Sequence, residues 1–217
     1  MKDFDAVVFD MDGVLFDSER ALMLCWLEVA EEYGIENIEK PYYASVGANA
    51  AKTRQIMLEA YGEDFPYDRY AEEAFQMYLK RYGSGRLPVK NGVFEILEFL
   101  KSNGKKIALA SSTRKEAVFS RLRDGGILEY FDVVITGDMV TKSKPEPDIF
   151  LLACEKLGVS PCSVYVIEDS FNGIKAAHRG ALKPIMVPDL LPADEEMREL
   201  SEAVIVDLTS VITYLKE

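Results

Sequence analysis

The sequence predicts an α/β fold in which a parallel sheet forms the core and a smaller helical domain is inserted near the start of the chain. Short apolar runs alternate with helical patterns along most of the sequence, which is typical of βαβ units. Residues 18 to about 82 break this alternation with three helical patterns and no strand between them. A chain of 217 residues is long enough for one domain with a smaller one inserted into it.

The predicted strands are short apolar segments with many β-branched residues, as expected for strands buried in a sheet. They are AVVF at 6–9, KIALA at 106–110, DVVIT at 132–136, VYVI at 164–167 and PIMV at 184–187.

Helical patterns lie between these strands. Ahead of the second strand, NGVFEILEFLKSNG repeats apolar residues at i, i+3, i+4 and i+7, which is one face of an amphipathic helix. Between the second and third strands, KEAVFSRLRDGG places Val118 and Leu122 four residues apart and ends at glycines, where a helix is expected to stop. Such helices provide the crossover connections that parallel strands require.

The inserted segment contains SERALMLCWLEVAEEYG, ANAAKTRQIMLEAYG and DRYAEEAFQMYLKRYG, each with a helical pattern. After it, GSGRLPVKNG is rich in Gly and Pro and predicts a hinge, with a matching hinge near residues 16–17. We therefore expect a helical cap domain at 17–86 and an α/β core domain at 1–16 and 87–217.

The composition is that of a folded globular protein, with 48% hydrophobic and 29% charged residues. A formal net charge of −12 disfavours binding to nucleic acid or to an anionic membrane surface. The sequence shows neither a signal-peptide pattern nor an apolar stretch of membrane-spanning length, so we expect a cytoplasmic protein. We also expect a monomer, because no exposed apolar stripe is evident.

Polar residues follow three of the predicted strands, where ligands bind in open α/β sheets. The stretch AVVFDMDGVLFDSE places three aspartates in eight residues directly after the first strand. The polar residues at the three strand ends are Asp10 and Asp12; Ser111, Ser112 and Thr113; and Glu168, Asp169 and Ser170. Carboxylates crowded at one sheet edge repel one another unless a cation neutralises them, and oxygen ligands of this kind favour Mg²⁺.

A fixed cation for phosphate oxygens is available in TKSKPEPDIF, where Lys144 precedes a proline that restricts its backbone. Taken singly, these features have simpler explanations, because a DxD after an apolar run is often a turn and a hydroxyl cluster is often a helix cap. A lone lysine is usually solvated. Their common order after successive strands is what favours a site for phosphoryl transfer.

Four motifs, DMDGVLFDS, ASST, KSKPEPDIF and VIEDSFNGIKAA, resemble those of the haloacid dehalogenase superfamily. Among its members, the β-phosphoglucomutase-like phosphatases are the most similar, and the resemblance spans nearly the whole chain. It implies a Rossmann-like parallel-sheet core with an inserted helical cap domain.

The resemblance also implies roles for individual residues. Asp10 would be the nucleophile that forms an aspartyl-phosphate, and Asp12 the general acid and base. The implied Mg²⁺ ligands are Asp10, the backbone carbonyl of Asp12, and Asp169, with Glu168 acting directly or through water. The transferring phosphoryl group would be bound by Ser111 and Lys144, helped by the backbone N–H of Ser112.

The same residues disfavour several alternative functions on this fold. Halide-releasing members lack the second aspartate and need no metal, so Asp12, Glu168 and Asp169 disfavour them. Transport ATPases have much larger domains. A binding module that has lost its chemistry is disfavoured, because Asp10, Asp12, Lys144 and Asp169 are all present.

A phosphosugar mutase remains the main alternative to a phosphatase. Arg114 could hold the second phosphate of a sugar bisphosphate. Mutases of the family carry a histidine where this chain has Leu22, and an arginine where it has Asn49 and Ala50. We therefore favour Mg²⁺-dependent hydrolysis of a small phosphorylated metabolite, such as a sugar phosphate. The candidate substrate contacts are Asn49, Lys52, Arg54 and Arg114.

Overall fold

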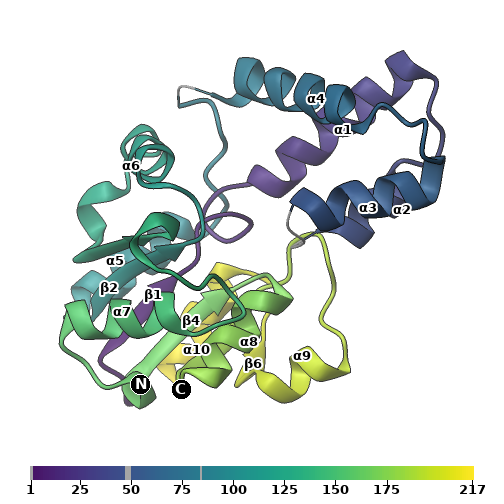
Figure 1. The fold of residues 1–217 in the computed structure, drawn as a ribbon. Coiled ribbons are helices and arrows are strands. Elements are labelled where there is room, and N and C mark those ends of the chain that lie inside the picture. The colour runs from purple at the N-terminus through teal and green to yellow at the C-terminus, as the bar shows by residue number, and fades with distance from the viewer. Residues whose placement is uncertain (1, 47–49, 84) are drawn as a thin grey trace.

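A parallel sheet lies at the centre of the computed structural model, which describes residues 2–46, 50–83 and 85–217. In these described residues the sheet has six strands in the order β3-β2-β1-β4-β5-β6 (Figure 1). The strands are β1 (Ala6–Phe9), β2 (Lys106–Ser111), β3 (Val133–Thr136), β4 (Val164–Glu168), β5 (Lys183–Met186) and β6 (Ala203–Val204).

The first strand of the chain occupies the centre of the sheet, with β2 on one side and β4 on the other. Phe9 is in register with both Leu109 and Ile167. The residues that follow these three therefore emerge at the same level of the sheet. The strand order also reverses at β1, and crevices at such switch points are the usual ligand sites of open α/β sheets.

Helices cover both faces of the sheet, and the alternation of side chains along the strands explains how. Val7 and Phe9 face a layer made by α5 (Val93–Ser102), α6 (Lys115–Asp124) and α10 (Leu208–Lys216). Ala6 and Val8 face α7 (Asp148–Leu157) and α8 (Phe171–Arg179). The short helix α9 (Glu195–Leu200) packs against α8.

Four helices between β1 and α5 form a separate layer, and we call them the cap helices. They are α1 (Ser18–Tyr33), α2 (Glu39–Ser45), α3 (Ala50–Tyr61) and α4 (Tyr67–Tyr82). They pack around Trp26, whose ring centroid lies 5.4 Å from that of Tyr42 and 5.0 Å from that of Tyr70. Figure 1 shows the cap helices standing apart from the sheet and its covering helices.

Two chain segments connect the cap helices to the sheet, and they run side by side. The Asp17 N–H donates to the Pro88 carbonyl at 3.1 Å, and the Lys90 N–H donates to the Leu15 carbonyl at 2.9 Å. These are the segments in which the sequence predicts hinges.

The α/β architecture is confirmed, with differences at the ends and in the short elements. The helix α2 is not predicted by the sequence pattern, because Pro41 interrupts it, yet a proline in the first turn removes no helical hydrogen bond. The strand β6 is too short for a recognisable pattern. β2 and β4 extend by one residue, so that Ser111 and Glu168 belong to the strands. Among the described helices, none combines the length and the apolar character needed to cross a membrane.

Candidate active site

Residues predicted for catalysis, phosphate binding and metal binding meet at the carboxyl ends of the three central strands. Asp10 follows β1 directly, Ser111 ends β2 and Glu168 ends β4. Ser111 and Glu168 are buried and Asp10 is 7% exposed. The register of β1 with both neighbours brings them to one edge of the sheet.

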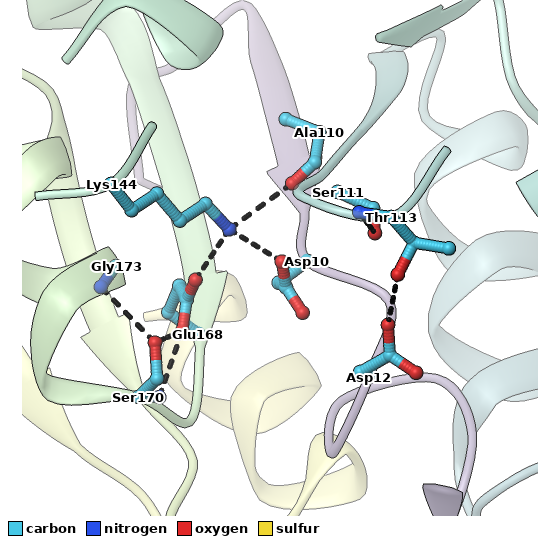
Figure 2. Close-up of polar contacts among 9 residues, drawn as sticks. All are labelled: Asp10, Asp12, Ala110, Ser111, Thr113, Lys144, Glu168, Ser170 and Gly173. Carbon is cyan, nitrogen blue, oxygen red and sulfur yellow. Dashed lines mark hydrogen bonds and ion pairs between the residues drawn. The ribbon is translucent and has the colours of Figure 1, made fainter. Parts of the chain in front are cut away.

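The Lys144 ammonium joins these strand ends. It contacts a carboxylate oxygen of Asp10 and donates to the Ala110 carbonyl at 3.2 Å and to Glu168 Oε1 at 2.6 Å (Figure 2). Burial opposes its charge, but the carboxylates of Asp10 and Glu168 outweigh this effect and raise the pKa of Lys144. Lys144 therefore carries a fixed positive charge against Asp10.

Both carboxylate oxygens of Glu168 have partners within the protein. Oε1 accepts from Lys144, and Oε2 accepts from the Ser170 N–H and hydroxyl, each at 2.8 Å. Ser170 in turn caps α8 by accepting from the Gly173 N–H at 3.1 Å. A side chain at Gly173 would collide with Glu168, since its Cβ would lie 1.8 Å from Oε1. Glu168 thus fixes the position of Lys144 and of the β4–α8 turn.

Asp12 is held by hydrogen bonds from three parts of the chain. Its Oδ1 accepts from the Ser18 hydroxyl at 2.7 Å and contacts the Arg121 guanidinium, and its Oδ2 accepts from the Thr113 hydroxyl at 2.9 Å. Figure 2 shows the Asp12 carboxylate pointing toward Thr113. Arg121 also donates to the hydroxyl of Tyr78, in α4, at 3.3 Å.

Of these partners of Asp12, the sequence analysis selects Thr113 as a strand-end residue without assigning it a role, and does not select Ser18 or Arg121. Ser18 and Thr113 lie inside quoted motifs, so their hydroxyls provided a signal. Arg121 lies 109 residues from Asp12, and no local pattern connects the two.

Asp169 has no counter-charge among the described residues, where its side chain takes part in neither a hydrogen bond nor an ion pair. Burial, followed by the carboxylates of Glu168 and Asp10, raises its pKa well above the usual range. It packs closely on Gly13, which has a φ of +79°, and a Cβ there would come within 2.2 Å of Asp169 Oδ2. The same crowding affects Asp10, whose pKa burial raises to about 7 despite the contact with Lys144.

This charge imbalance fits a divalent cation. Two cations, Lys144 and Arg121, pair with carboxylates of the predicted metal set of Asp10, Asp12, Glu168 and Asp169. If all four carboxylates are ionised, two negative charges are left over. Within the described residues no cluster of three or more His, Cys, Asp or Glu side chains is arranged as a metal cage. Mg²⁺ suits such a site, since it usually takes one or two carboxylates and keeps several waters.

The predicted site residues line a hollow of about 250 Å³ that adjoins a larger cavity of about 720 Å³. Five residues line both, which shows that they are continuous: Glu19, Val46, Ser112, Lys144 and Ser170. The larger cavity is closed on the other side by cap-helix residues, Leu22, Trp26, Tyr42, Ser45 and Thr53. The site therefore lies between the sheet and the cap helices.

Two charged side chains at the junction of the sheet and the cap helices differ in their partners. Lys90, from the second connecting segment, pairs with Asp189 at 2.6 Å and donates to the Gly13 carbonyl at 2.6 Å. Glu19 has no hydrogen bond or ion pair through its carboxyl group within the described residues. Burial, Asp12 and Asp189 raise its pKa to about 7.

The predicted phosphate-binding residues lie together. Ser111, Ser112 and Lys144 all line the hollow that contains Asp10. The Ser111 hydroxyl accepts from the Thr113 N–H at 3.1 Å, which orders the turn after β2.

The predicted substrate contacts are placed differently. Asn49 lies outside the described residues. Lys52 donates to Gln55 at 3.2 Å, Arg54 lies 3.5 Å from Asp68, and Arg114 is exposed at the start of α6. Among the described residues that line the two hollows, Lys52, Arg54 and Arg114 do not appear.

Three comparisons relate the chain to known proteins. Residues 4–180 match the family model described as haloacid dehalogenase-like hydrolase. A phosphorylated carbohydrates phosphatase from Thermotoga maritima is 35% identical over 214 residues, which cover 98% of this chain and 99% of that protein. A solved structure from the same species, described provisionally as a β-phosphoglucomutase, has a TM-score of 0.79 at 34% identity and covers 98% of both chains. Fructose-1-phosphate phosphatase YqaB from Escherichia coli is 27% identical over 186 residues, 85% of this chain and 96% of that protein.

Proposed function

The chain belongs to the haloacid dehalogenase-like hydrolases, and we propose that, as a phosphatase of this family, it removes phosphate from a small phosphorylated carbohydrate through a phosphorylated Asp10. Phosphorylated carbohydrates are named in the descriptions of two relatives, at 35% and 27% identity. Hydrolases of this family generally use Mg²⁺, and we propose the same cofactor here.

The observation that carries the proposal is the charge arrangement around Asp10. Its carboxylate lies at the central strand end, beside a buried lysine, with the uncompensated carboxylate of Asp169 nearby in the same hollow. Asp10 and Asp169, with the backbone carbonyl of Asp12, would hold Mg²⁺. The metal would neutralise charge on the phosphate oxygens and on these carboxylates.

In the first half-reaction, a carboxylate oxygen of Asp10 attacks phosphorus and the ester P–O bond breaks. Asp12, in its protonated form, gives its proton to the departing alkoxide oxygen, so that an alcohol leaves. Lys144 and the hydroxyl of Ser111 neutralise and orient the phosphoryl oxygens, which is the main task of a protein in phosphoryl transfer.

In the second half-reaction, the Asp12 carboxylate takes a proton from water, and the water oxygen attacks phosphorus. The bond between phosphorus and Asp10 breaks, which releases inorganic phosphate and restores the Asp10 carboxylate. Asp12 is left protonated for the next turnover, so the two steps balance.

Phosphate release tests this proposal. The panel contains sugar phosphates, polyol phosphates and p-nitrophenyl phosphate, each in Mg²⁺ or in excess EDTA. We expect release in Mg²⁺, its loss in EDTA and its recovery when Mg²⁺ is restored. Asp10→Asn should lower kcat by about 10³-fold or more, whereas Asp5→Asn, an exposed aspartate before β1, should not.

Conversion of β-glucose 1-phosphate to glucose 6-phosphate is measured alongside. Leu22 lines the cavity at the position where mutases of the family carry a histidine, so we expect little isomerisation. Efficient isomerisation with little phosphate released would overturn the proposal in favour of a mutase.

A further inference from the structure

The larger cavity has an unusual charge content for an enzyme that handles phosphates. Among its described lining residues, Lys144 is the one cation, and Lys144 is already engaged by Asp10 and Glu168 at the phosphoryl end. The remaining lining consists of hydroxyl, amide, aromatic and aliphatic groups and the carboxyl of Glu19. A second anionic group on the substrate would therefore find no counter-charge there.

Nearby basic residues do not change this balance. Arg54 pairs with Asp68 on α4, and Lys175, which borders an adjoining hollow, pairs with Glu196 at 2.9 Å. The segment 47–49, whose structure is not described, reads Gly-Ala-Asn and contributes no basic side chain.

The second observation concerns Glu19, the acidic residue in the lining of the larger cavity. Glu19 lines both the catalytic hollow and the larger cavity, and its carboxyl group has no hydrogen bond or ion pair within the described residues. The acidic groups near it are Asp12, Asp169 and Asp189, and the cation near it is Arg121, which is paired with Asp12. In its ionised form, a carboxyl group in this position accepts hydrogen bonds from hydroxyl groups and repels anions.

The opposite wall is suited to the carbon skeleton of a sugar. Trp26 and Tyr42 present aromatic surface to the cavity, and Leu22 adds aliphatic surface. Aromatic rings provide large contact area with little loss of conformational entropy. Small-molecule sites usually have a mostly apolar lining with a few polar groups that fix the orientation of the ligand.

We propose that this cavity selects monophosphates with an uncharged, polyhydroxylated body, with Glu19 as the hydroxyl-binding residue, and that it rejects substrates with a second anionic group. This inference rests on the proposed function and narrows its substrate class. It also replaces the basic contacts Lys52, Arg54 and Arg114, which the sequence predicts, with a neutral and acidic surface.

Matched substrate pairs test the rejection of a second anion. The pairs are fructose 1-phosphate with fructose 1,6-bisphosphate, and glycerol 3-phosphate with 3-phosphoglycerate. In each pair, we expect kcat/KM to be at least about 10-fold higher for the substrate whose phosphate is its only anionic group. The second anionic group of the other substrate would be buried in the cavity without a counter-charge, which is costly. Equal values in both pairs would overturn the inference.

Variants test the role of Glu19. Glu19→Gln should lower kcat/KM for fructose 1-phosphate about 10-fold more than it lowers kcat/KM for p-nitrophenyl phosphate, which has no hydroxyl group to bind. The control Glu32→Gln makes the same change at an exposed position of α1. Equal effects of the two variants on fructose 1-phosphate would contradict the assignment of Glu19.

A gain-of-function variant keeps the test independent of Glu19. Thr53→Lys adds a cation to the cavity wall, and Gln55→Lys adds the same charge at an exposed position of the same helix. Thr53→Lys, but not Gln55→Lys, should lower the ratio of kcat/KM for fructose 1-phosphate to kcat/KM for fructose 1,6-bisphosphate. An unchanged ratio in Thr53→Lys would count against the inference. If the wild-type protein shows no Mg²⁺-dependent hydrolysis of p-nitrophenyl phosphate or of any sugar phosphate, that result would instead refute the proposed function itself.

Discussion

Asp12 is held at both carboxylate oxygens by side chains that come from different parts of the chain. Ser18 begins α1 of the cap helices, Thr113 follows β2, and Arg121 lies on α6. Because Arg121 also reaches Tyr78 on α4, the orientation of Asp12 is tied to the position of two cap helices. The proton transfer proposed for Asp12 requires accurate placement of its carboxylate, so we expect this network to affect catalysis.

Arg121→Ala should disturb the placement of Asp12. We expect kcat/KM for sugar phosphates to fall by about 10- to 100-fold, since small misplacements of catalytic groups have effects of this order. For p-nitrophenyl phosphate the fall should be much smaller, because its phenolate leaves without a proton. Steady-state kinetics with both substrates measures the difference.

The control for that experiment is Arg123→Ala, which removes an exposed arginine from the same helix. Arg121→Lys should restore part of the activity by retaining the charge. A parallel loss toward both substrates in Arg121→Ala would mean that Arg121 is merely structural.

At the scale of elements, the sequence predicted the strands best, since buried parallel strands are continuous apolar runs. The polar residues at the strand ends could be identified because they directly follow these apolar runs. The cap contacts were harder to find, because the residue of a helix that faces a cavity depends on packing. Thr53 lines the cavity while its neighbours Lys52 and Arg54 do not, as expected when successive residues point about 100° apart around a helix. Arg121 was missed for a related reason, because tertiary packing alone brings it to Asp12.

The turn between β1 and α1 depends on Gly13, which combines a positive φ with close packing on Asp169. Gly13→Ala should lower the free energy of unfolding by about 1–3 kcal/mol through backbone strain, and should also weaken Mg²⁺ binding by displacing Asp169. Chemical denaturation and Mg²⁺ titration of activity measure the two effects.

Gly62→Ala is the matched control, since Gly62 also has a positive φ but has no neighbour within 4 Å of an added Cβ. It should lower stability while leaving the Mg²⁺ dependence unchanged. An unaltered Mg²⁺ dependence in Gly13→Ala would show that the contact with Asp169 does not position a metal ligand.

For the molecule as a whole, the site is a source of instability that a divalent cation would relieve. A carboxyl group whose pKa is higher in the folded than in the unfolded chain binds more protons when folded. Its contribution to stability therefore declines as the pH rises from its ordinary value of 3.8 to the folded value, about 7 for Asp10. Asp169 acts in the same direction.

We therefore expect Mg²⁺ to raise the Tm more at about pH 8 than at about pH 5, where these carboxyl groups are more protonated in the metal-free protein. Asp169→Asn should raise the Tm in EDTA and abolish the increase caused by Mg²⁺. Thermal unfolding with and without Mg²⁺ measures both, with the exposed Asp64→Asn as control. A lower Tm in EDTA for Asp169→Asn would be inconsistent with an uncompensated charge.

The central claim is that Asp10 carries the phosphoryl group, and trapping that group tests it most directly. In Asp12→Asn, p-nitrophenyl phosphate should still phosphorylate Asp10, because its leaving group needs no proton, whereas hydrolysis of the acyl phosphate should slow for want of a base. Borohydride reduction during turnover, followed by peptide mass spectrometry, should find homoserine at position 10. Reduction at another carboxyl group, or at none while phosphate is still released, would contradict the account.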